Sequence, residues 1–245
     1  MPRATTFGTR AADYDRLRPG PHPDALDRVL PATARTVVDL AAGTGLVTRA
    51  ILARADAPVV VAVEPDRRML ARVTGATAAC AVAEHLPLAD ASVDAVVASS
   101  AWHWFDEQAA TAEIARVLRP GGTLGLLWSR PDPTVPWVAE VRGVGRTAAD
   151  GARPPTRRGL EFALPGGFGF VDDTPEPVCV SWSRRMTRDE VAGMVCTYSG
   201  VLELDAAAQD AVFRAARERL DELVGGGDPV DVPFETIGRR WTASP

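Results

Sequence analysis

The chain has 245 residues, of which 46% are hydrophobic and 24% are charged, a balance typical of a globular protein and not of a disordered one. Its formal net charge of −5 argues against the extended basic surface that binds nucleic-acid phosphates. Its 27 basic residues are all arginine, and it contains neither lysine nor asparagine, which indicates a bacterial genome rich in G and C.

No part of the sequence resembles a targeting segment or a membrane span. The start, MPRATTFGTRAADYDRLRPG, lacks the apolar core of a signal peptide, and no later run approaches about 18 uninterrupted apolar residues. Cys80, Cys179 and Cys196 are odd in number and lack C-x-x-C spacing, so neither a disulfide framework nor a zinc site is indicated. We expect one cytoplasmic domain over residues 1–245, as monomer or homodimer, without metal, membrane or nucleic-acid partners.

In the first half, apolar runs of strand length alternate with amphipathic stretches, which predicts βα units and a parallel sheet. The runs are rich in Val, Ala and Leu, as in strands that are covered on both faces. The predicted strands are Thr36–Leu40, Val59–Val63, Thr77–Val82, Val93–Ser99 and Thr123–Trp128.

A helix is predicted before the fifth of these strands. Asp106 is its expected N-cap, and Pro120-Gly121-Gly122 is expected to end it and turn the chain into the strand. The predicted buried face contains Ala110, Ile114, Val117 and Leu118.

The segment from 131 to 170 is rich in Pro, Gly and Arg, with a predicted helix over Trp137–Ala149 and no clear strand. It is too long for an ordinary connection in a compact domain, which favours a lid over the substrate.

Regular structure is predicted again towards the C-terminus. The helix that ends before Gly225-Gly226-Gly227 has Phe213, Ala216, Leu220 and Leu223 on one face. The predicted elements are a strand over Val178–Ser183, helices over Arg188–Tyr198 and Asp205–Val224, and a closing strand over Val230–Trp241.

The segment TVVDLAAGTGL, Thr36 to Leu46, predicts a ligand site where the first strand turns into a helix. Gly43 and Gly45 allow a ligand to approach the backbone, and the helix that follows presents unpaired N–H groups. A nicotinamide-binding turn would read G-x-G-x-x-G instead. Asp39 would repel a pyrophosphate and attract a cationic amine or sulfonium.

Two further segments point to the same edge of the sheet. VVVAVEPD, Val59 to Asp66, places Glu64 after the second strand, where an acid can accept both hydroxyls of a ribose. The segment AVAEHLPLADASVDAVVASSAWHWFD, Ala81 to Asp106, holds two small loops around a buried strand, and the backbone of the first loop can pair with an adenine edge. Trp102 or Trp104, after the fourth strand, can face a sulfonium.

Together these motifs resemble the class I S-adenosylmethionine-dependent methyltransferases, in particular the small-molecule branch around trans-aconitate methyltransferase, which has an A-x-H-W-F-D segment. The resemblance extends over FGTRAADYDRLRPGPHP near the start and VDVPFETIGRRW near the end. It implies a doubly wound α/β fold with a mostly parallel, Rossmann-like sheet of seven strands, an antiparallel last strand and a helical lid insertion.

The resemblance also implies a cofactor site for S-adenosyl-L-methionine. Within the N-terminal segment 1–30, Tyr14 and Arg18 match residues that close over the cofactor. The implied cofactor-binding residues are Tyr14, Arg18, Asp39, Ala41, Gly43, Gly45, Glu64, Pro65, Val82, Ala83, Glu84 and Ser99.

Two positions depart from the family pattern. Ala41 replaces the first glycine of D-x-G-x-G-x-G, which is tolerated only if its φ is negative. Val82 stands where an aspartate often binds the adenine amine, so the backbone is expected to hold adenine.

The sequence motifs identify the residues that would contact the methyl acceptor less clearly than those for the cofactor. His103 is a candidate catalytic base, although a packing or substrate-bonding role is an open alternative because methyl transfer needs in-line geometry more than a base. The candidate substrate residues are Trp102, His103, Trp104, Trp137 and Tyr198, with core packing as the alternative for the tryptophans.

The function expected from these patterns is methyl transfer to O, N or C of a small molecule. A cofactor-dependent cyclase or a binding protein on the same fold is an alternative, since fold does not fix chemistry. A nicotinamide oxidoreductase is disfavoured by the first loop.

Overall fold

The computed structural model describes residues 11–150, 163–174 and 176–244, with side chains except those of 146–150. Parts of the predicted N-terminal segment and lid, residues 1–10 and 151–162, therefore lie outside the described residues. Within the described part, no helix combines the length and apolar character needed to cross a bilayer.

The chain forms two compact units. The sheet unit comprises Gly20–Ser129, Arg157–Val180 and Thr236–Pro245, and the helical unit comprises Met1–Pro19, Arg130–Thr156 and Ser181–Glu235.

The strands are β1 (Thr36–Leu40), β2 (Val59–Val63), β3 (Thr77–Ala79), β4 (Val93–Ser99), β5 (Leu118–Pro131), β6 (Phe170–Asp172), β7 (Val178–Met186) and β8 (Val230–Ala243). Their order is β3-β2-β1-β4-β5-β8-β6, and β7 pairs with β8. The first five are parallel where they pair, and β8 is antiparallel to the edge strand β6. The predicted mixed α/β fold is confirmed, with the unpredicted short strand β6 as an eighth strand in the described part.

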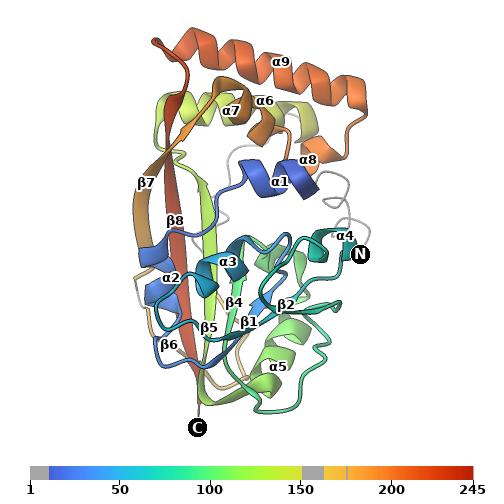
Figure 1. Ribbon diagram of the computed structural model, residues 1–245, viewed down its shortest axis with the longest axis vertical. Coiled ribbons are helices and arrows are strands. Elements are labelled where there is room, and N and C mark those ends of the chain that lie inside the picture. Colours follow the sequence, from blue (N-terminus) through green and yellow to red (C-terminus); the bar gives the residue numbers. More distant parts are fainter. Residues whose placement is uncertain (1–10, 151–162, 175, 245) are drawn as a thin grey trace. The chain divides into compact units, whose positions relative to one another are not determined.

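In the sheet unit, helices cover both faces of the sheet (Figure 1). The helices are α2 (Pro23–Val29), α3 (Leu46–Leu52), α4 (Arg67–Leu70), the 3-10 helix η2 (Trp102–Trp104) and α5 (Glu107–Val117). Neighbouring strand residues pack in opposite directions: Val37 and Val97 join the α2 and α3 core, whereas Val38 and Val96 join the α5 core. This explains why the predicted strands are continuously apolar.

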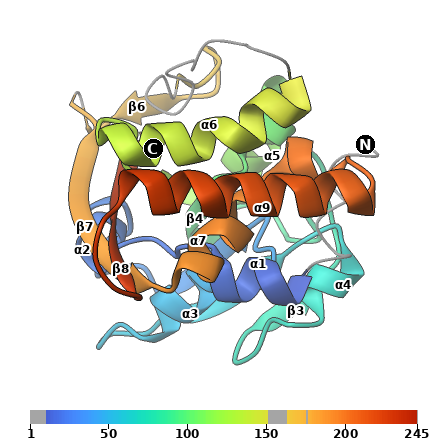
Figure 2. The same ribbon diagram turned by 90° about the horizontal axis from the view of Figure 1, so that it is seen from above.

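The helical unit contains α1 (Ala11–Leu17), α6 (Pro136–Asp150), α7 (Arg188–Val195), α8 (Ser199–Leu202) and α9 (Ala206–Leu223). Helices α6 and α9 lie side by side, with α7 beside α9 (Figure 2). The predicted α9 is confirmed, and the Asp205 side chain accepts from Ala208 N–H as its N-cap. The predicted helix Arg188–Tyr198 is too long: α7 ends at Val195, and Tyr198 is the N-cap residue of the separate α8.

Several predicted boundaries are wrong. The strand predicted over Thr123–Trp128 spans Leu118–Pro131 as β5, and the strand predicted over Val178–Ser183 continues to Met186 as β7. Helix α5 begins after the predicted Asp106 cap but ends at Val117, before Pro120-Gly121-Gly122, because Leu118 already pairs with Val93 on β4. The next pair is Thr123 with Ala95, so the proline and glycines form a bulge inside β5. The third strand stops at Ala79 instead of Val82.

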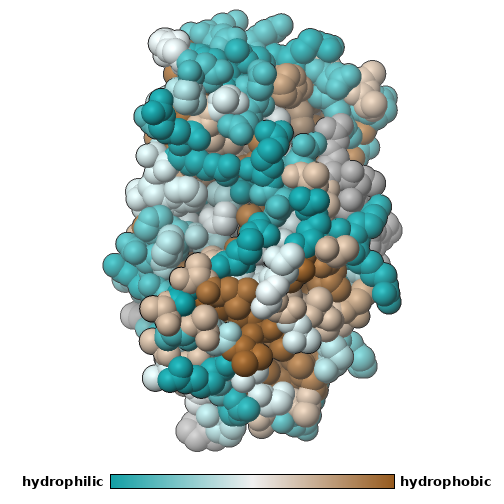
Figure 3. All heavy atoms as spheres, in the orientation of Figure 1, coloured by the Kyte–Doolittle hydropathy of each residue, from teal (hydrophilic) through white to brown (hydrophobic). Residues whose placement is uncertain are grey.

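The face shown in Figure 3 gathers hydrophobic residues in the lower part of the view, where β1, β2 and α3 lie in Figure 1. Val59 and Val171 are the exposed large hydrophobic residues of the described part. Val59 opens β2 and therefore lies at the amino edge of the sheet, away from the carboxyl edge that the motifs point to.

The bulge gives a test of the β5 geometry. A Cβ at Gly122 would lie 2.8 Å from Arg119 O and 3.0 Å from Asp94 O, both backbone atoms that cannot move cheaply. We expect Gly122→Ala to lower the free energy of unfolding by about 1–3 kcal/mol, measured by chemical denaturation. Gly166→Ala, where a Cβ would meet nothing within 4 Å, is the matched control. Equal losses in both variants would contradict the bulge.

Candidate functional site

The motif residues meet at the carboxyl edge of the sheet, where the strand order reverses. β1 pairs with β2 on one side and with β4 on the other, and open α/β sheets bind ligands at such a switch point. Ala41 (φ 54°) follows β1 and Ser100 (φ 55°) follows β4. Two non-glycine residues in the left-handed region on adjacent loops are a mark of functional sites.

The loop after β1 is a compact turn with an unusual backbone. Gly43 (φ 56°) and Gly45 (φ 85°) are left-handed, which is the conformation that glycine adopts without strain. Ala42 N–H donates to Val63 O (3.0 Å), and Gly45 N–H donates to Ala42 O (2.8 Å). The loop is therefore tied both to itself and to β2.

The expectation that Ala41 has a negative φ is wrong. Its φ of 54° lies in the left-handed region, where the Cβ of an alanine strains the backbone.

Asp39 lies within β1 and is only 1% exposed. Its Oδ2 accepts from Thr48 Oγ1 of α3 (2.5 Å), whereas its Oδ1 is buried and has no hydrogen-bond partner within the described part of the chain. Burial raises the pKa of Asp39 to about 7; the Thr48 hydrogen bonds oppose this and the charge of Glu64 adds to it. A buried, half-satisfied carboxylate is an acceptor in need of a donor.

Glu64 follows β2 and connects two loops. Its Oε2 accepts from Gly43 N–H (2.9 Å) and its Oε1 from Asp66 N–H (2.9 Å). Burial raises the pKa of Glu64, the two backbone hydrogen bonds lower it, and the charge of Asp66 raises it further. Asp66 in turn caps α4 by accepting from Arg68 N–H (2.9 Å).

The other predicted cofactor residues lie on neighbouring loops. Pro65 O accepts from Cys80 Sγ (3.5 Å), and Val82 forms an isolated bridge with His85. Ala83 is buried, and Glu84 Oε1 accepts from Asp106 N–H (2.9 Å), which links the predicted adenine loop to the start of α5. Ser99 ends β4 opposite Leu127.

The aromatic segment after β4 divides into a buried and an exposed part. Trp102 is 6% exposed and packs in the core against Phe105 (5.6 Å between ring centres). The exposed His103 has its ring 4.6 Å from that of Trp104 and 4.9 Å from that of Trp128. Sequence reasoning missed Trp128, although its place at the end of the predicted fifth strand was a usable signal.

Comparison with known proteins gives the family. Residues 38–126 match the family model described as a methyltransferase domain. A Mycobacterium tuberculosis protein described as an uncharacterised methyltransferase is 34% identical over 243 aligned residues, covering 97% of this chain and 95% of the relative. The chain belongs to the methyltransferase family.

Two further similarities place this methyltransferase among known proteins. A solved structure from Anaeromyxobacter dehalogenans, named as a type II methyltransferase, has a TM-score of 0.65 and 26% identity, covering 93% of this chain and 99% of that chain. A malonyl-[acyl-carrier protein] O-methyltransferase of Dechloromonas aromatica is 42% identical over 101 residues, only 40% of this chain and 38% of the relative.

The helical unit of the methyltransferase contains the remaining predicted residues. The guanidinium carbon of Arg18 lies 5.5 Å from the ring centre of Tyr14 and 4.6 Å from that of Tyr198. Trp137 packs against the same hydrophobic cluster as Tyr198. The structure brings these side chains together within their own unit, and their roles toward cofactor and substrate stay predictions.

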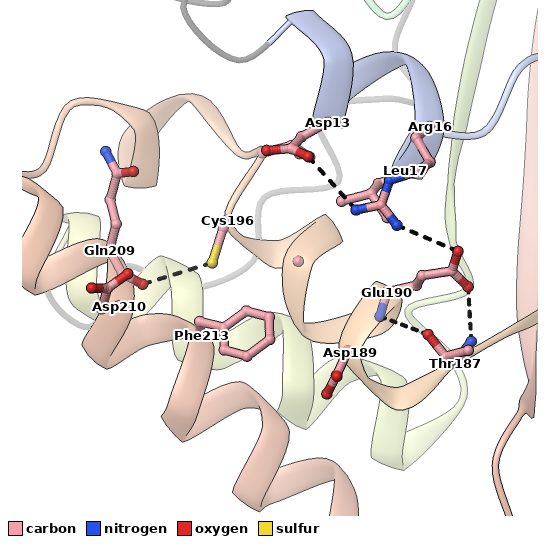
Figure 4. Close-up of a pocket in the computed structure, with 12 residues that line it drawn as sticks. Asp13, Arg16, Leu17, Thr187, Asp189, Glu190, Cys196, Gln209, Asp210 and Phe213 are labelled. Atoms are coloured by element: carbon pink, nitrogen blue, oxygen red, sulfur yellow. Dashed lines mark hydrogen bonds and ion pairs between the residues drawn. The ribbon is translucent and has the colours of Figure 1, made fainter.

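A pocket of about 350 Å³ lies in the helical unit between α1, α7 and α9 (Figure 4). Arg16 bridges Asp13 and Glu190 beside it, and Cys196 Sγ contacts Gln209 O (3.8 Å). None of the predicted site residues lines it. Across the described residues, no group of three or more His, Cys, Asp or Glu side chains is arranged to hold a metal ion.

Strain at Ala41 predicts a stabilising substitution. A left-handed alanine costs the folded state about 1–2 kcal/mol, and Ala41→Gly removes this cost. The substitution adds a smaller cost, because glycine loses more conformational entropy on folding. We expect the free energy of unfolding to rise by up to about 1 kcal/mol, measured by chemical denaturation. Ala109→Gly on the exposed face of α5 is the control and is expected to lose about 1 kcal/mol. A loss of stability in Ala41→Gly would refute the strain.

Burial of Asp39 predicts a pH-dependent stability. Because the pKa of Asp39 is about 7 when folded and near its ordinary 3.8 when unfolded, the folded protein holds the proton more tightly between these values. The contribution of Asp39 to the free energy of unfolding therefore falls as pH rises through that window. We expect the stability of Asp39→Asn relative to the unsubstituted chain to increase from about pH 5 to about pH 8 in denaturant titrations. A pH-independent difference would refute the burial of an ionisable acid.

Proposed function

We propose that this methyltransferase is a class I, S-adenosylmethionine-dependent enzyme that methylates a small molecule at O, N or C. The observation that carries the proposal is a pair of buried carboxylates, Asp39 and Glu64, on neighbouring strands at the switch point of the sheet. The sequence resemblance to the trans-aconitate methyltransferase branch supports the same assignment.

The residues at this edge fit the cofactor. S-adenosylmethionine, when bound, supplies an electrophilic methyl group on a sulfonium, and it carries an ammonium group on its amino-acid end. The unpartnered Oδ1 of Asp39 is an acceptor for a cationic group, which would offset the desolvation of the carboxylate. In the loop from Ala41 to Gly45, the two glycines Gly43 and Gly45 carry no side chain that would block a close approach.

Glu64 is suited to the ribose hydroxyls. Each of its oxygens already accepts one backbone N–H, and a carboxylate oxygen retains a second lone pair for another donor. The bonds to Gly43 and Asp66 fix the carboxylate in place before any ligand arrives. The other residues proposed to bind the cofactor are Tyr14, Arg18, Ala41, Gly43, Gly45, Pro65, Val82, Ala83, Glu84 and Ser99.

The acceptor is proposed to lie beside His103 and Trp104, with Trp128 added to the predicted set. Trp102 is better explained as a core residue, since its indole lies in the apolar cluster of α5. His103 can orient an acceptor or take its proton, while Trp137 and Tyr198 remain proposed substrate residues. The partial likeness to an O-methyltransferase makes a hydroxyl or carboxyl oxygen the first acceptor atom to test.

Cofactor binding tests the two acids separately. We expect Asp39→Asn and Glu64→Gln each to weaken S-adenosylmethionine binding about tenfold or more in calorimetric titrations, because the first removes an ionic interaction with a cationic group and the second removes a charged acceptor for the ribose hydroxyls. Adenosine, which lacks the sulfonium and amine, should depend on Glu64 and not on Asp39. Affinity of the unsubstituted protein for S-adenosylmethionine should fall as Asp39 gains its proton below about pH 7, and Asp39→Asn should lack this dependence.

Glu107→Gln, an exposed substitution at the start of α5, is the control for charge loss. If Asp39→Asn and Glu64→Gln both left the affinity for S-adenosylmethionine unchanged, the proposed cofactor site would be refuted.

Methyl transfer itself is tested with S-adenosylmethionine labelled in its methyl group and a small-molecule extract of the host. A labelled product together with S-adenosylhomocysteine is the expected result. Product formation that leaves the cofactor unconsumed would indicate a cyclase instead.

A further inference from the structure

Two arginine side chains approach one tyrosine in the helical unit. Tyr198 precedes α8, Arg18 follows α1 and Arg142 lies on α6. The guanidinium carbons of Arg18 and Arg142 lie 4.6 Å and 6.0 Å from the ring centre of Tyr198. Three separate helices thus bring two positive charges to a single aromatic side chain.

Neither charge is balanced by an acid from residues 11–150, 163–174 or 176–244. Arg18 donates from Nε to Thr197 Oγ1 (2.8 Å) and from Nη2 to Thr197 O (3.0 Å), and Arg142 donates from Nη1 to Pro131 O (2.9 Å). These partners are neutral oxygens, and within the described part of the chain no carboxylate forms an ion pair with either arginine. The hydrogen bonds hold both guanidiniums in place without neutralising them.

Two donors at this position are also buried and unpaired. Arg142 Nε and Tyr198 Oη have no hydrogen-bond partner among the residues that the structure describes. Each unpaired buried donor costs about 1–3 kcal/mol, more for a charged group, so such groups call for an explanation. Because Nη1 of Arg142 is occupied, its free edge is Nε with Nη2, the parallel pair that binds a carboxylate through both oxygens.

Cation–π packing alone explains only part of this arrangement. It accounts for the position of the guanidiniums near the ring and for about 0.5–2 kcal/mol per contact. It does not account for the unpaired tyrosine hydroxyl or the unpaired Nε. We propose that Arg142, Arg18 and Tyr198 form a binding site for the carboxylate of a small molecule.

The carboxylate has two possible sources, and only one of them rests on the proposed function. It belongs either to the amino-acid end of the cofactor or to a separate organic acid. The test uses the full chain in calorimetric titrations with three probes: S-adenosylhomocysteine, 5′-methylthioadenosine, which is a related nucleoside without the carboxylate, and citrate.

The variants separate ligand binding from packing. Tyr198→Phe keeps the ring and removes only the hydroxyl, and Arg142→Met removes the charge but keeps an unbranched apolar stem. Arg214→Gln, an exposed arginine on α9, is the control. We expect both site variants to weaken a carboxylate probe about tenfold or more, and the control to leave it unchanged. Binding of 5′-methylthioadenosine should be the same in all of them.

Each outcome decides the proposal. Weakened S-adenosylhomocysteine with no citrate binding assigns the carboxylate to the cofactor, and weakened citrate with unchanged S-adenosylhomocysteine assigns it to a separate acid. If neither carboxylate probe is affected, or if Tyr198→Phe lowers the unfolding midpoint without affecting affinity, the cluster is packing only and the proposal fails. Absence of 5′-methylthioadenosine binding would count against the proposed cofactor site alone.

Discussion

The site depends on the buried carboxylate of Glu64, which accepts one N–H from the loop after β1 and one from the loop after β2. Through Gly43 it holds the left-handed turn, and through Asp66 it holds the start of α4. Buried carboxylates are costly, and these two hydrogen bonds lower that cost while fixing the loops to each other. This carboxylate adds to the backbone bond from Ala42 N–H to Val63 O, which also ties the loop after β1 to β2.

Asp39 shows what such an arrangement costs. Its pKa is raised to about 7, first by burial and in part by the charge of Glu64, and one of its oxygens is unpaired. Ala41 adds backbone strain in the same turn. Backbone strain and uncompensated charge persist only where the surrounding structure holds them in place. A cationic ligand beside Asp39 would offset both the cost of burying its charge and its repulsion by Glu64.

The cluster of Arg18, Arg142 and Tyr198 in the helical unit differs from Asp39 in charge. Arg18 and Arg142 bond to neutral oxygens, and the unpaired groups there are donors, whereas the unpaired Oδ1 of Asp39 in the sheet unit is an acceptor. The pocket beside α1, with Asp13, Asp189, Glu190 and Asp210 in its lining, differs from both.

The sequence alone determined the fold class, the β1, β2 and β4 limits and the candidate acids, because strands buried on both faces leave uninterrupted apolar runs and the acids end those runs. It also determined the cap of α9 at Asp205, since capping is a local interaction. Only the tertiary structure decided the early end of α5, where pairing with Val93 overrides the Pro-Gly-Gly signal. The positive φ of Ala41 and the burial of Trp102 likewise depend on residues distant in sequence, and a local pattern contains no information about such contacts.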